Sequence, residues 1–366
     1  MRLILLVVVI FSLLGMGCSN EKSADQLFEQ EFNNLKTKSF TILEGSQTPL
    51  WEFVQSEKDR QTLATFEKAY NKRIDAKEAS QYRIPNTIHF IWIGPNNFPI
   101  ESLENIRMWK KHNPTATFKF WTDRPRMAPV AGMDIHYIKD FHFEKLGALF
   151  EESKNWAEKA DILRLEILEK EGGIYVDHDA DCLRSFDSLQ KSFDFFAALE
   201  PPHDPIGDLA VTIGIGIIGS APHHPFILKS IEVLESRWKT VTAQFDDKDP
   251  LSLATRVMHR TYLPLTLVAQ TEIMNHQNSI ILPAHYFYPS KYQKAALYSK
   301  HYYGTSWNHL GKKSKVKRYY HMLEPFFKHE AAAFRLFLLF ALITFIVTVV
   351  MLYKIIFRGK YYENVK

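Results

Sequence analysis

Two aspartates one residue apart, Asp177 and Asp179, are the clearest candidates for chemistry in this 366-residue sequence. They follow the short apolar run 174–176, which predicts a strand leading directly into the acidic pair. Because alternate residues of a strand point to the same side, both carboxylates are expected to converge, with His178 pointing to the other side. Carboxylates so placed suit Mn²⁺ or Mg²⁺, which leave coordination positions for phosphate oxygens and water. The pair therefore indicates a divalent-cation site shared with a phosphorylated substrate.

The residues before this pair distinguish it from the solvated turns in which two acids also occur by chance. The run 156–170 predicts a helix, and the glycines at 172–173 supply the left-handed residue that ends it. Asp161 and Arg164 lie three residues apart on this helix and therefore share a face. Asp181, just beyond the pair, is either a further metal ligand or a solvated acid of the turn.

A second block, from 87 to 93, is rich in β-branched and aromatic residues and ends at a Gly-Pro pair. This pattern predicts a buried strand followed by a loop. Trp92 at its end is either a core residue or a platform on which a uracil or guanine ring stacks. His89 is expected to be a hydrogen-bonded core residue and not a ligand.

Strand-like and helix-like segments alternate along the middle of the chain. The predicted order is strand 87–93, helix 102–112, strand 116–121, strand 135–138 and helix 156–170. Such alternation predicts an α/β fold with a largely parallel sheet and helices on both faces. The acidic pair would then lie at the carboxyl end of a central strand, where open α/β sheets bind ligands.

The glycine-containing run 213–219 is expected to be a buried strand whose glycines let a ligand or a neighbouring backbone approach closely. It lacks the strand, G-x-G-x-x-G and helix order that a dinucleotide site requires. The adjacent histidines 223–224 point apart in an extended turn, so they predict a loop that enters a helix over 225–241.

These segments together resemble the Asp-x-Asp sugar transferases of the glycosyltransferase 32 type, which are related to Golgi and sphingolipid mannosyltransferases and to clostridial glucosylating toxins. The resemblance covers residues 84–310 and rests on three blocks. The first is the strand block 84–95, and the third is the segment 301–307, which corresponds to the family's His/Tyr-x-x-x-S-W motif. The central block carries, in the family's order, Asp161, Arg164, Leu168, Gly172, Gly173, Tyr175, Asp177 and Asp179.

The resemblance implies a GT-A-like domain that transfers a sugar from a UDP- or GDP-sugar with retention of anomeric configuration, using Mn²⁺ or Mg²⁺. It also implies roles for individual residues: Asp177 and Asp179 at the metal and ribose, Asp161 and Arg164 at the sugar hydroxyls and diphosphate, Trp92 at the base, Tyr175 at the substrate, and Ser306 and Trp307 at the leaving diphosphate. The sequence departs from the family's pattern near Ile213 and Ala254, where loops contact the sugar or the acceptor.

The hydrophobic ends of the chain predict attachment to a membrane. The expected organisation is a signal peptide or N-terminal anchor over 1–20, a helical flanking region over 21–80, the transferase domain over 81–318, a juxtamembrane linker over 319–335, a transmembrane helix over 336–353 and a short basic tail over 354–366. Cys18 is either lipidated or part of an uncleaved anchor or an ordinary signal peptide. With Cys182 it makes only two cysteines, too few for a disulfide framework.

The formal net charge is only +4, and basic residues over 312–318 adjoin the apolar segment. This placement suits anionic lipid head groups, and no basic face interleaved with readout residues indicates nucleic-acid binding. The expected acceptor is a glycolipid or another membrane-proximal molecule. Two other functions stay open: a metal-dependent phosphohydrolase, and an inactive transferase-derived protein that binds membranes.

Overall fold

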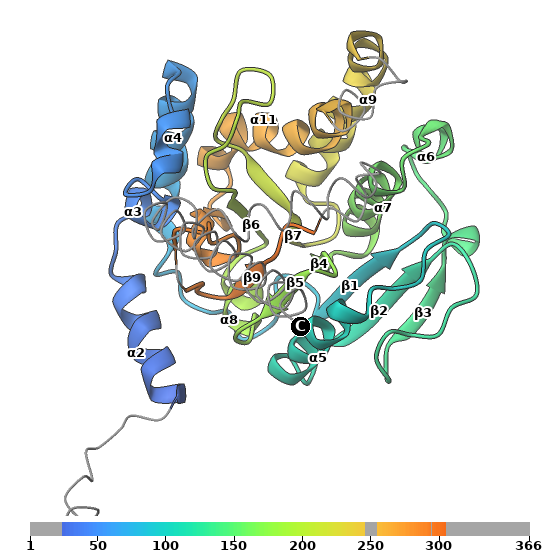
Figure 1. Ribbon diagram of the computed structural model, residues 1–366, viewed down its shortest axis with the longest axis horizontal. Helices are drawn as coiled ribbons and strands as arrows, with labels where there is room; N and C mark the ends of the chain where they lie inside the picture. The colour runs from blue at the N-terminus through green and yellow to red at the C-terminus, as the bar shows by residue number, and fades with distance from the viewer. Residues whose placement is uncertain (1–23, 246–254, 294, 305–366) are drawn as a thin grey trace, which may run out of the picture. The chain divides into compact units, whose positions relative to one another are not determined.

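A seven-stranded sheet forms the centre of the computed structural model, which describes residues 24–245, 255–293 and 295–304 (Figure 1). The order across the sheet is β3-β2-β1-β4-β7-β6-β8. The strands are β1 (Thr87–Trp92), β2 (Thr117–Thr122), β3 (Asp134–Tyr137), β4 (Gly173–Val176), β6 (Phe195–Leu199), β7 (Ile213–Ser220) and β8 (Ser279–Leu282). Of these seven, β7 runs antiparallel to both its neighbours, and every other pairing is parallel. The predicted α/β fold with a mostly parallel central sheet is therefore confirmed.

Both faces of the sheet are covered. All four residues of β4 and the middle four residues of β1 are buried, so side chains pointing to either side are shielded from water. Helix α7 (Trp156–Glu171) contacts β1, β4 and β7. It begins at Asn155, whose side chain accepts the backbone N–H groups of the first turn, and ends at Gly172, which has a φ of 64°. The predicted helix and its glycine stop are confirmed.

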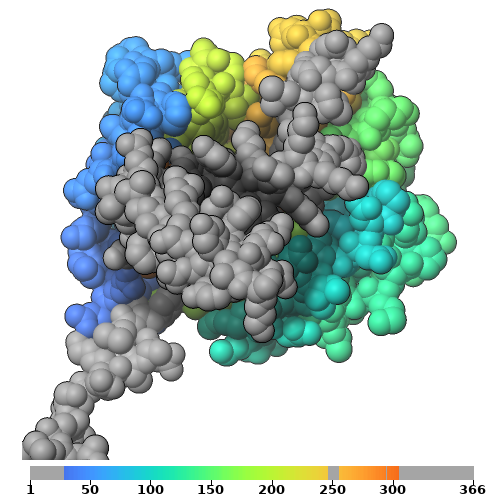
Figure 2. Space-filling view, viewed as in Figure 1, coloured from blue at the N-terminus to red at the C-terminus, as the bar shows by residue number. Residues whose placement is uncertain are grey.

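The N-terminal helices belong to the same hydrophobic core as the sheet. Helix α4 (Glu57–Arg73) packs on the edge strand β8, and its Phe66 lies in one buried cluster with Phe40 of α3 (Phe40–Glu44) and the strand residues. The N-terminal helices and the β1–β2–β3 part of the sheet lie at opposite sides of the face seen in Figure 2.

The remaining helices surround this core. They are α2 (Ala24–Lys36), α5 (Leu103–His112), α6 (Gly147–Glu152), α8 (Asp187–Ser192), α9 (Pro225–Gln244), α11 (Leu263–Glu272), the π-helix η4 (Met258–Tyr262) and the 3-10 turns η1 (Pro49–Phe53), η2 (Ile100–Ser102), η3 (Ile138–Asp140), η5 (Ile273–Asn275) and η6 (Ala284–Tyr286). His224 caps α9, as expected for a loop that enters a helix. Among the described helices, none combines the length and the apolar character needed to cross a bilayer. The predicted transmembrane segment 336–353 lies outside the described residues, as do Ser306 and Trp307.

A second, two-stranded sheet begins directly after the acidic pair. Strand β5 (Ala180–Cys182) pairs antiparallel with β9 (Ser299–His301), and the register places Ala180 opposite His301. This pairing brings a distant part of the chain to the carboxyl end of β4.

Candidate functional site

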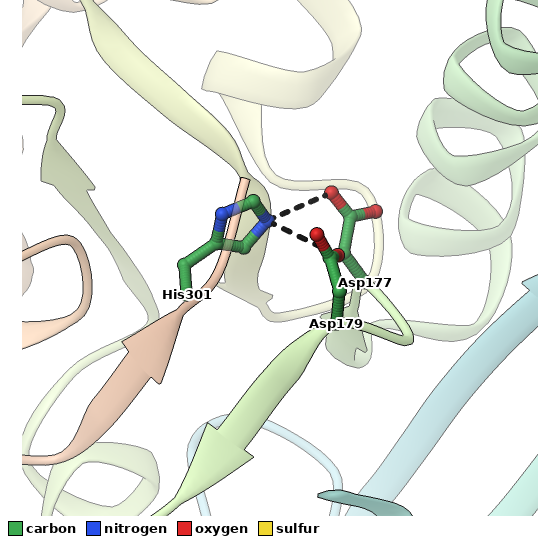
Figure 3. A group of neighbouring side chains, drawn as sticks. All are labelled: Asp177, Asp179 and His301. Carbon is green, nitrogen blue, oxygen red and sulfur yellow. Dashed lines mark hydrogen bonds and ion pairs between the residues drawn. The ribbon is translucent and has the colours of Figure 1, made fainter. Parts of the chain in front are cut away.

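The Asp-x-Asp pair forms a turn between β4 and β5. Strand β4 ends at Val176, before the first aspartate, whereas an extended run through the pair would reach Asp179. The Asp177 backbone N–H donates to the Gly216 carbonyl at 2.7 Å, and the Ala180 N–H donates to the Asp177 carbonyl at 3.1 Å, which closes the turn. The carboxylates nevertheless converge as predicted, because both face the imidazole of His301 (Figure 3).

His301 completes a group of three potential metal ligands. Its Nε2 lies 3.3 Å from Asp177 Oδ2 and 3.5 Å from Asp179 Oδ1, and one ligand atom from each residue lies within 4.8 Å of the others. Two carboxylates with one imidazole form a donor set that Mn²⁺ accepts readily. The residues present therefore fit the predicted divalent cation, and the sequence-based ligand set lacked His301.

Each aspartate has one oxygen held by the protein and one that faces His301. Asp177 Oδ1 accepts the Tyr175 hydroxyl at 2.6 Å and lies 3.3 Å from Arg164 Nη2. Asp179 Oδ2 accepts the backbone N–H of Gly304. The two oxygens that point toward His301 are therefore the ones available to a cation.

His178 points away from this group, as predicted. Its Nδ1 lies 2.8 Å from the Ser102 hydroxyl, and its carbonyl accepts the Asn105 amide at 3.0 Å. Its ring meets the Trp92 ring edge-on, with centroids 5.0 Å apart. These contacts anchor the turn from the side opposite to the carboxylates.

A buried network from α7 supports Asp177. Arg164 Nη2 lies 2.7 Å from Asp161 Oδ1, and both side chains are shielded from water, since the arginine is only 3% exposed and the aspartate 6%. The second Asp161 oxygen accepts the Thr261 hydroxyl at 2.7 Å. Arg164 also donates to the Ile215 carbonyl of β7 and lies over the Tyr175 ring. The charged pair predicted on one helical face is thus present and is directed at the acidic pair.

The surroundings of Asp177 and Asp161 shift the pKa values of the two carboxyl groups in opposite directions. Burial raises the pKa of Asp177, but the nearby charge of Arg164 and the bonds to His301 and Tyr175 outweigh it, so the pKa falls to about 2. For Asp161, burial outweighs Arg164 and Thr261 and raises the pKa to about 6. At neutral pH Asp177 is therefore firmly ionised, as a metal ligand must be.

Gly216 and Gly304 leave room for the side chains of the three potential metal ligands. A Cβ on Gly216 of β7 would lie 2.8 Å from Asp177 Oδ2 and 2.9 Å from His301 Nε2. A Cβ on Gly304 would lie 2.8 Å from Asp179 Oδ2. The predicted buried strand over 213–219 is confirmed, but its glycines make room for side chains and not for the ligand or backbone that was expected.

Three other predicted residues have clear positions. Trp92 is half-buried, and its indole N–H donates to the Asn96 carbonyl at 2.9 Å. Asp181 accepts the N–H of Cys182 at 2.8 Å and does not join the ligand group, which favours the turn-acid alternative. His89 is fully buried between the Gly172 carbonyl and the Trp121 indole, as expected for a core histidine.

Comparison with known proteins places this geometry in a class. Residues 99–196 match the family described as glycosyltransferase sugar-binding region containing DXD motif, and this segment includes both aspartates. The resemblance predicted from the sequence is therefore confirmed: residues 99–196 are similar to the DXD-containing sugar-binding region of glycosyltransferases.

Individual relatives and one solved structure are similar to parts of the chain. An uncharacterized glycosyltransferase of Acanthamoeba polyphaga mimivirus is 32% identical over 165 residues, covering 43% of this chain and 60% of that protein. A mannosyl phosphorylinositol ceramide synthase of Saccharomyces cerevisiae is 29% identical over 158 residues, covering 43% of this chain and 37% of that protein. The solved structure of the PaToxG glycosyltransferase is 19% identical with a TM-score of 0.42, over 59% of this chain and 79% of that one. The chain spans between 22% and 60% of the length of the curated relatives it matches.

Proposed function

We propose that the protein transfers a sugar from a UDP- or GDP-sugar to an acceptor hydroxyl, and that Asp177, Asp179 and His301 hold a divalent cation for this reaction. The observation that carries the proposal is the convergence of these three side chains at the carboxyl end of β4. The two aspartates, though not His301, lie within the matched region 99–196. That edge of an open α/β sheet is where such folds bind ligands.

The chain's own residues supply positioning and charge. When bound, Mn²⁺ or Mg²⁺ neutralises the diphosphate on which negative charge develops as the sugar leaves. Arg164 keeps Asp177 ionised and fixes its orientation, while Tyr175 holds the same oxygen. Arg164 and Asp161 are further proposed to contact the donor's diphosphate and sugar hydroxyls, a role supported by their direction toward the acidic pair.

Trp92, Ser306 and Trp307 are assigned to the donor's base and diphosphate. We assign the base to Trp92, which is half-buried and lies beside the turn of the acidic pair. Ser306 and Trp307 follow shortly after Gly304 in the sequence and are proposed to donate hydrogen bonds to the leaving diphosphate. Trp307→Ala should then lower turnover more than donor affinity, which steady-state kinetics would show.

The proposed acceptor is membrane-proximal, and a glycolipid is the favoured class. This part rests on the apolar segment 336–353, on the basic residues over 312–318, and on the likeness to two yeast proteins named as mannosyl phosphorylinositol ceramide synthases. Deleting residues 336–366 should release the protein from membranes. Unchanged activity toward a lipid acceptor after release would contradict the reason given for anchoring.

One assay separates this function from its alternatives. Purified protein is incubated with UDP- and GDP-hexoses, with Mn²⁺ or with a chelator, and both nucleoside diphosphate and inorganic phosphate are measured. Release of nucleoside diphosphate that requires Mn²⁺ supports the transferase. Release of inorganic phosphate would indicate a phosphohydrolase, and donor binding without any release would indicate an inactive binding protein.

A further inference from the structure

The loop that follows β1 holds the indole of Trp92 in place. Strand β1 ends at Trp92, and the chain turns at Gly94, where φ is 96°. The Trp92 indole N–H donates to the Asn96 carbonyl at 2.9 Å, which joins the ring to the backbone of the loop. The orientation of the ring therefore depends on where this carbonyl lies.

Arg126 binds the same carbonyl from the segment that follows the neighbouring strand β2. Its Nη1 donates to the Asn96 carbonyl at 2.6 Å, and its Nη2 donates to the Gly94 carbonyl. A carbonyl oxygen has two lone pairs, so the Asn96 carbonyl can accept the indole and the guanidinium together. Arg126 therefore tethers the part of the loop to which the Trp92 ring is bonded.

The guanidinium of Arg126 is itself fixed by the end of β2. Its Nε donates to the Thr122 hydroxyl at 3.1 Å, and its Nη2 lies 3.7 Å from Asp123 Oδ1. The Arg126 side chain is only 11% exposed. Because Nε, Nη1 and Nη2 all have protein partners, this guanidinium supports the loop and is not directed at a ligand.

Packing places the supported ring beside the acidic pair. A Cβ on Gly94 would lie 2.9 Å from the ring of Trp156, the first residue of α7, so the loop lies against that helix. The Trp92 ring meets the Phe98 ring at 5.5 Å and the His178 ring at 5.0 Å, both edge-on. Since His178 stands between the two aspartates, the loop that Arg126 holds also sets the position of Trp92 relative to them.

We infer that Arg126 is a positioning residue for the donor's base, because it holds the loop carbonyl that orients Trp92. The inference rests on the proposed function, in which the base stacks on Trp92. Stacking depends on the face of the ring being presented to the base, so a ring that is free to turn loses part of this contact. Arg126 acts through Trp92 and does not touch the donor.

The experiment is a double-mutant cycle on the full-length protein. Affinities for UDP and GDP with Mn²⁺ are measured by calorimetry for the wild type, Arg126→Met, Trp92→Ala and the variant with both changes. Inorganic pyrophosphate with Mn²⁺ serves as the probe that lacks a base, and the melting temperature reports folding. Arg126→Lys keeps the charge but cannot reproduce the fork that reaches both carbonyls. The control is Arg107→Met, which changes an exposed arginine of α5.

Arg126→Met should weaken binding of the preferred nucleoside diphosphate by about tenfold, and binding of pyrophosphate by less than about twofold, because the loss is confined to stacking. In the Trp92→Ala background, Arg126→Met should cause no further loss, since its effect passes through the missing ring. Arg126→Lys should keep part of the affinity, and Arg107→Met should match the wild type.

Three results would overturn the inference and leave the assignment of Trp92 intact: wild-type affinity in Arg126→Met, additive losses in the variant with both changes, or an equal loss for pyrophosphate. If Trp92→Ala kept full affinity for UDP and GDP, the assignment of the base to Trp92 and this inference would fall together. If the wild type bound neither nucleotide, the proposed function would fall as well.

Discussion

The two aspartates of the acidic pair are held by very different parts of the molecule. Asp177 is fixed by buried side chains: the Tyr175 hydroxyl at 2.6 Å and Arg164, which is itself fixed by Asp161 and the Ile215 carbonyl. Asp179 is held by the backbone N–H of Gly304 and by the facing His301. The half around Asp177 is called the fixed half below, and the half around Asp179, His301 and Gly304 the adjustable half.

With one fixed half and one adjustable half, the site can hold its ligand groups in place and still admit a large donor. The fixed half lies under α7 and β7, where packing leaves little freedom. The adjustable half continues into Tyr302 and Tyr303, which are 52% and 42% exposed. Tyr303 has a φ of 51°, an uncommon backbone conformation for a residue other than glycine. Segments with few buried contacts open at lower free energy, so this half is the one expected to rearrange when a donor binds.

The largest effect on activity is expected at Asp177, the metal-ligand candidate of the fixed half. Asp177→Asn removes the charge at a ligand that is ionised at neutral pH, and should lower nucleoside diphosphate release by about a thousandfold. The fold should survive, because asparagine can still accept the Tyr175 hydroxyl. Asp140→Asn, at an exposed aspartate of η3, serves as the matched control. Normal turnover in Asp177→Asn would remove the acidic pair from the reaction.

The second effect separates stability from activity in the fixed half. Arg164→Met leaves the buried Asp161 and the half-buried Asp177 without their shared arginine, and should lower the free energy of unfolding by about 3–5 kcal/mol. Arg107→Met removes an exposed arginine paired with Glu104, and should change it by less than about 1 kcal/mol. Denaturant unfolding measures both. Equal small effects would show that the network under Asp177 is not a structural support.

The third prediction compares the same substitution, glycine to alanine, in each half. Gly216→Ala should destabilise the protein by about 1–3 kcal/mol, because its Cβ meets Asp177 and His301 between packed strands. Gly304→Ala meets Asp179 at the same distance of 2.8 Å, but in a segment that can shift, and should cost less than about 1 kcal/mol. If Gly304→Ala were the more destabilising variant in thermal unfolding, the assignment of the two halves would be reversed.

The smallest effect on stability is expected at Thr261, which supports Asp161 in the fixed half. Thr261→Val removes the hydroxyl that Asp161 accepts, and should lower the free energy of unfolding by about 1–2 kcal/mol. Thr261→Ser keeps the hydroxyl and should recover most of that loss. Equal stability of the valine and serine variants would mean that the hydroxyl contributes little to holding Asp161.

The sequence predicts best those features whose residues lie close together along the chain. Helix α7, its glycine stop, β4 and the acidic pair form one continuous run, so periodicity and local geometry were sufficient to predict the converging carboxylates and the Asp161–Arg164 pair. The strand was predicted to continue through the pair, and the turn that replaces it depends on a bond to Gly216 in β7.

The missing site residues come from tertiary pairing. His301 lies in the segment 301–307, which resembles a family motif, but its place among the ligands depends on the β5–β9 register. The position of Thr261 depends on the π-helix η4, which departs from the 3.6-residue period that sequence patterns report. Pairing register and helix irregularity leave no local signal that a single sequence displays.

The central claim is that Asp177, Asp179 and His301 bind one divalent cation together. The most direct measurement is a calorimetric titration of the protein with Mn²⁺ in the presence of UDP or GDP, repeated with His301→Gln. We predict one ion per chain for the wild type, and an affinity lower by about tenfold or more for His301→Gln, whose melting temperature should stay close to that of the wild type. Equal Mn²⁺ affinity in the two proteins, or no binding to the wild type, would contradict the claim.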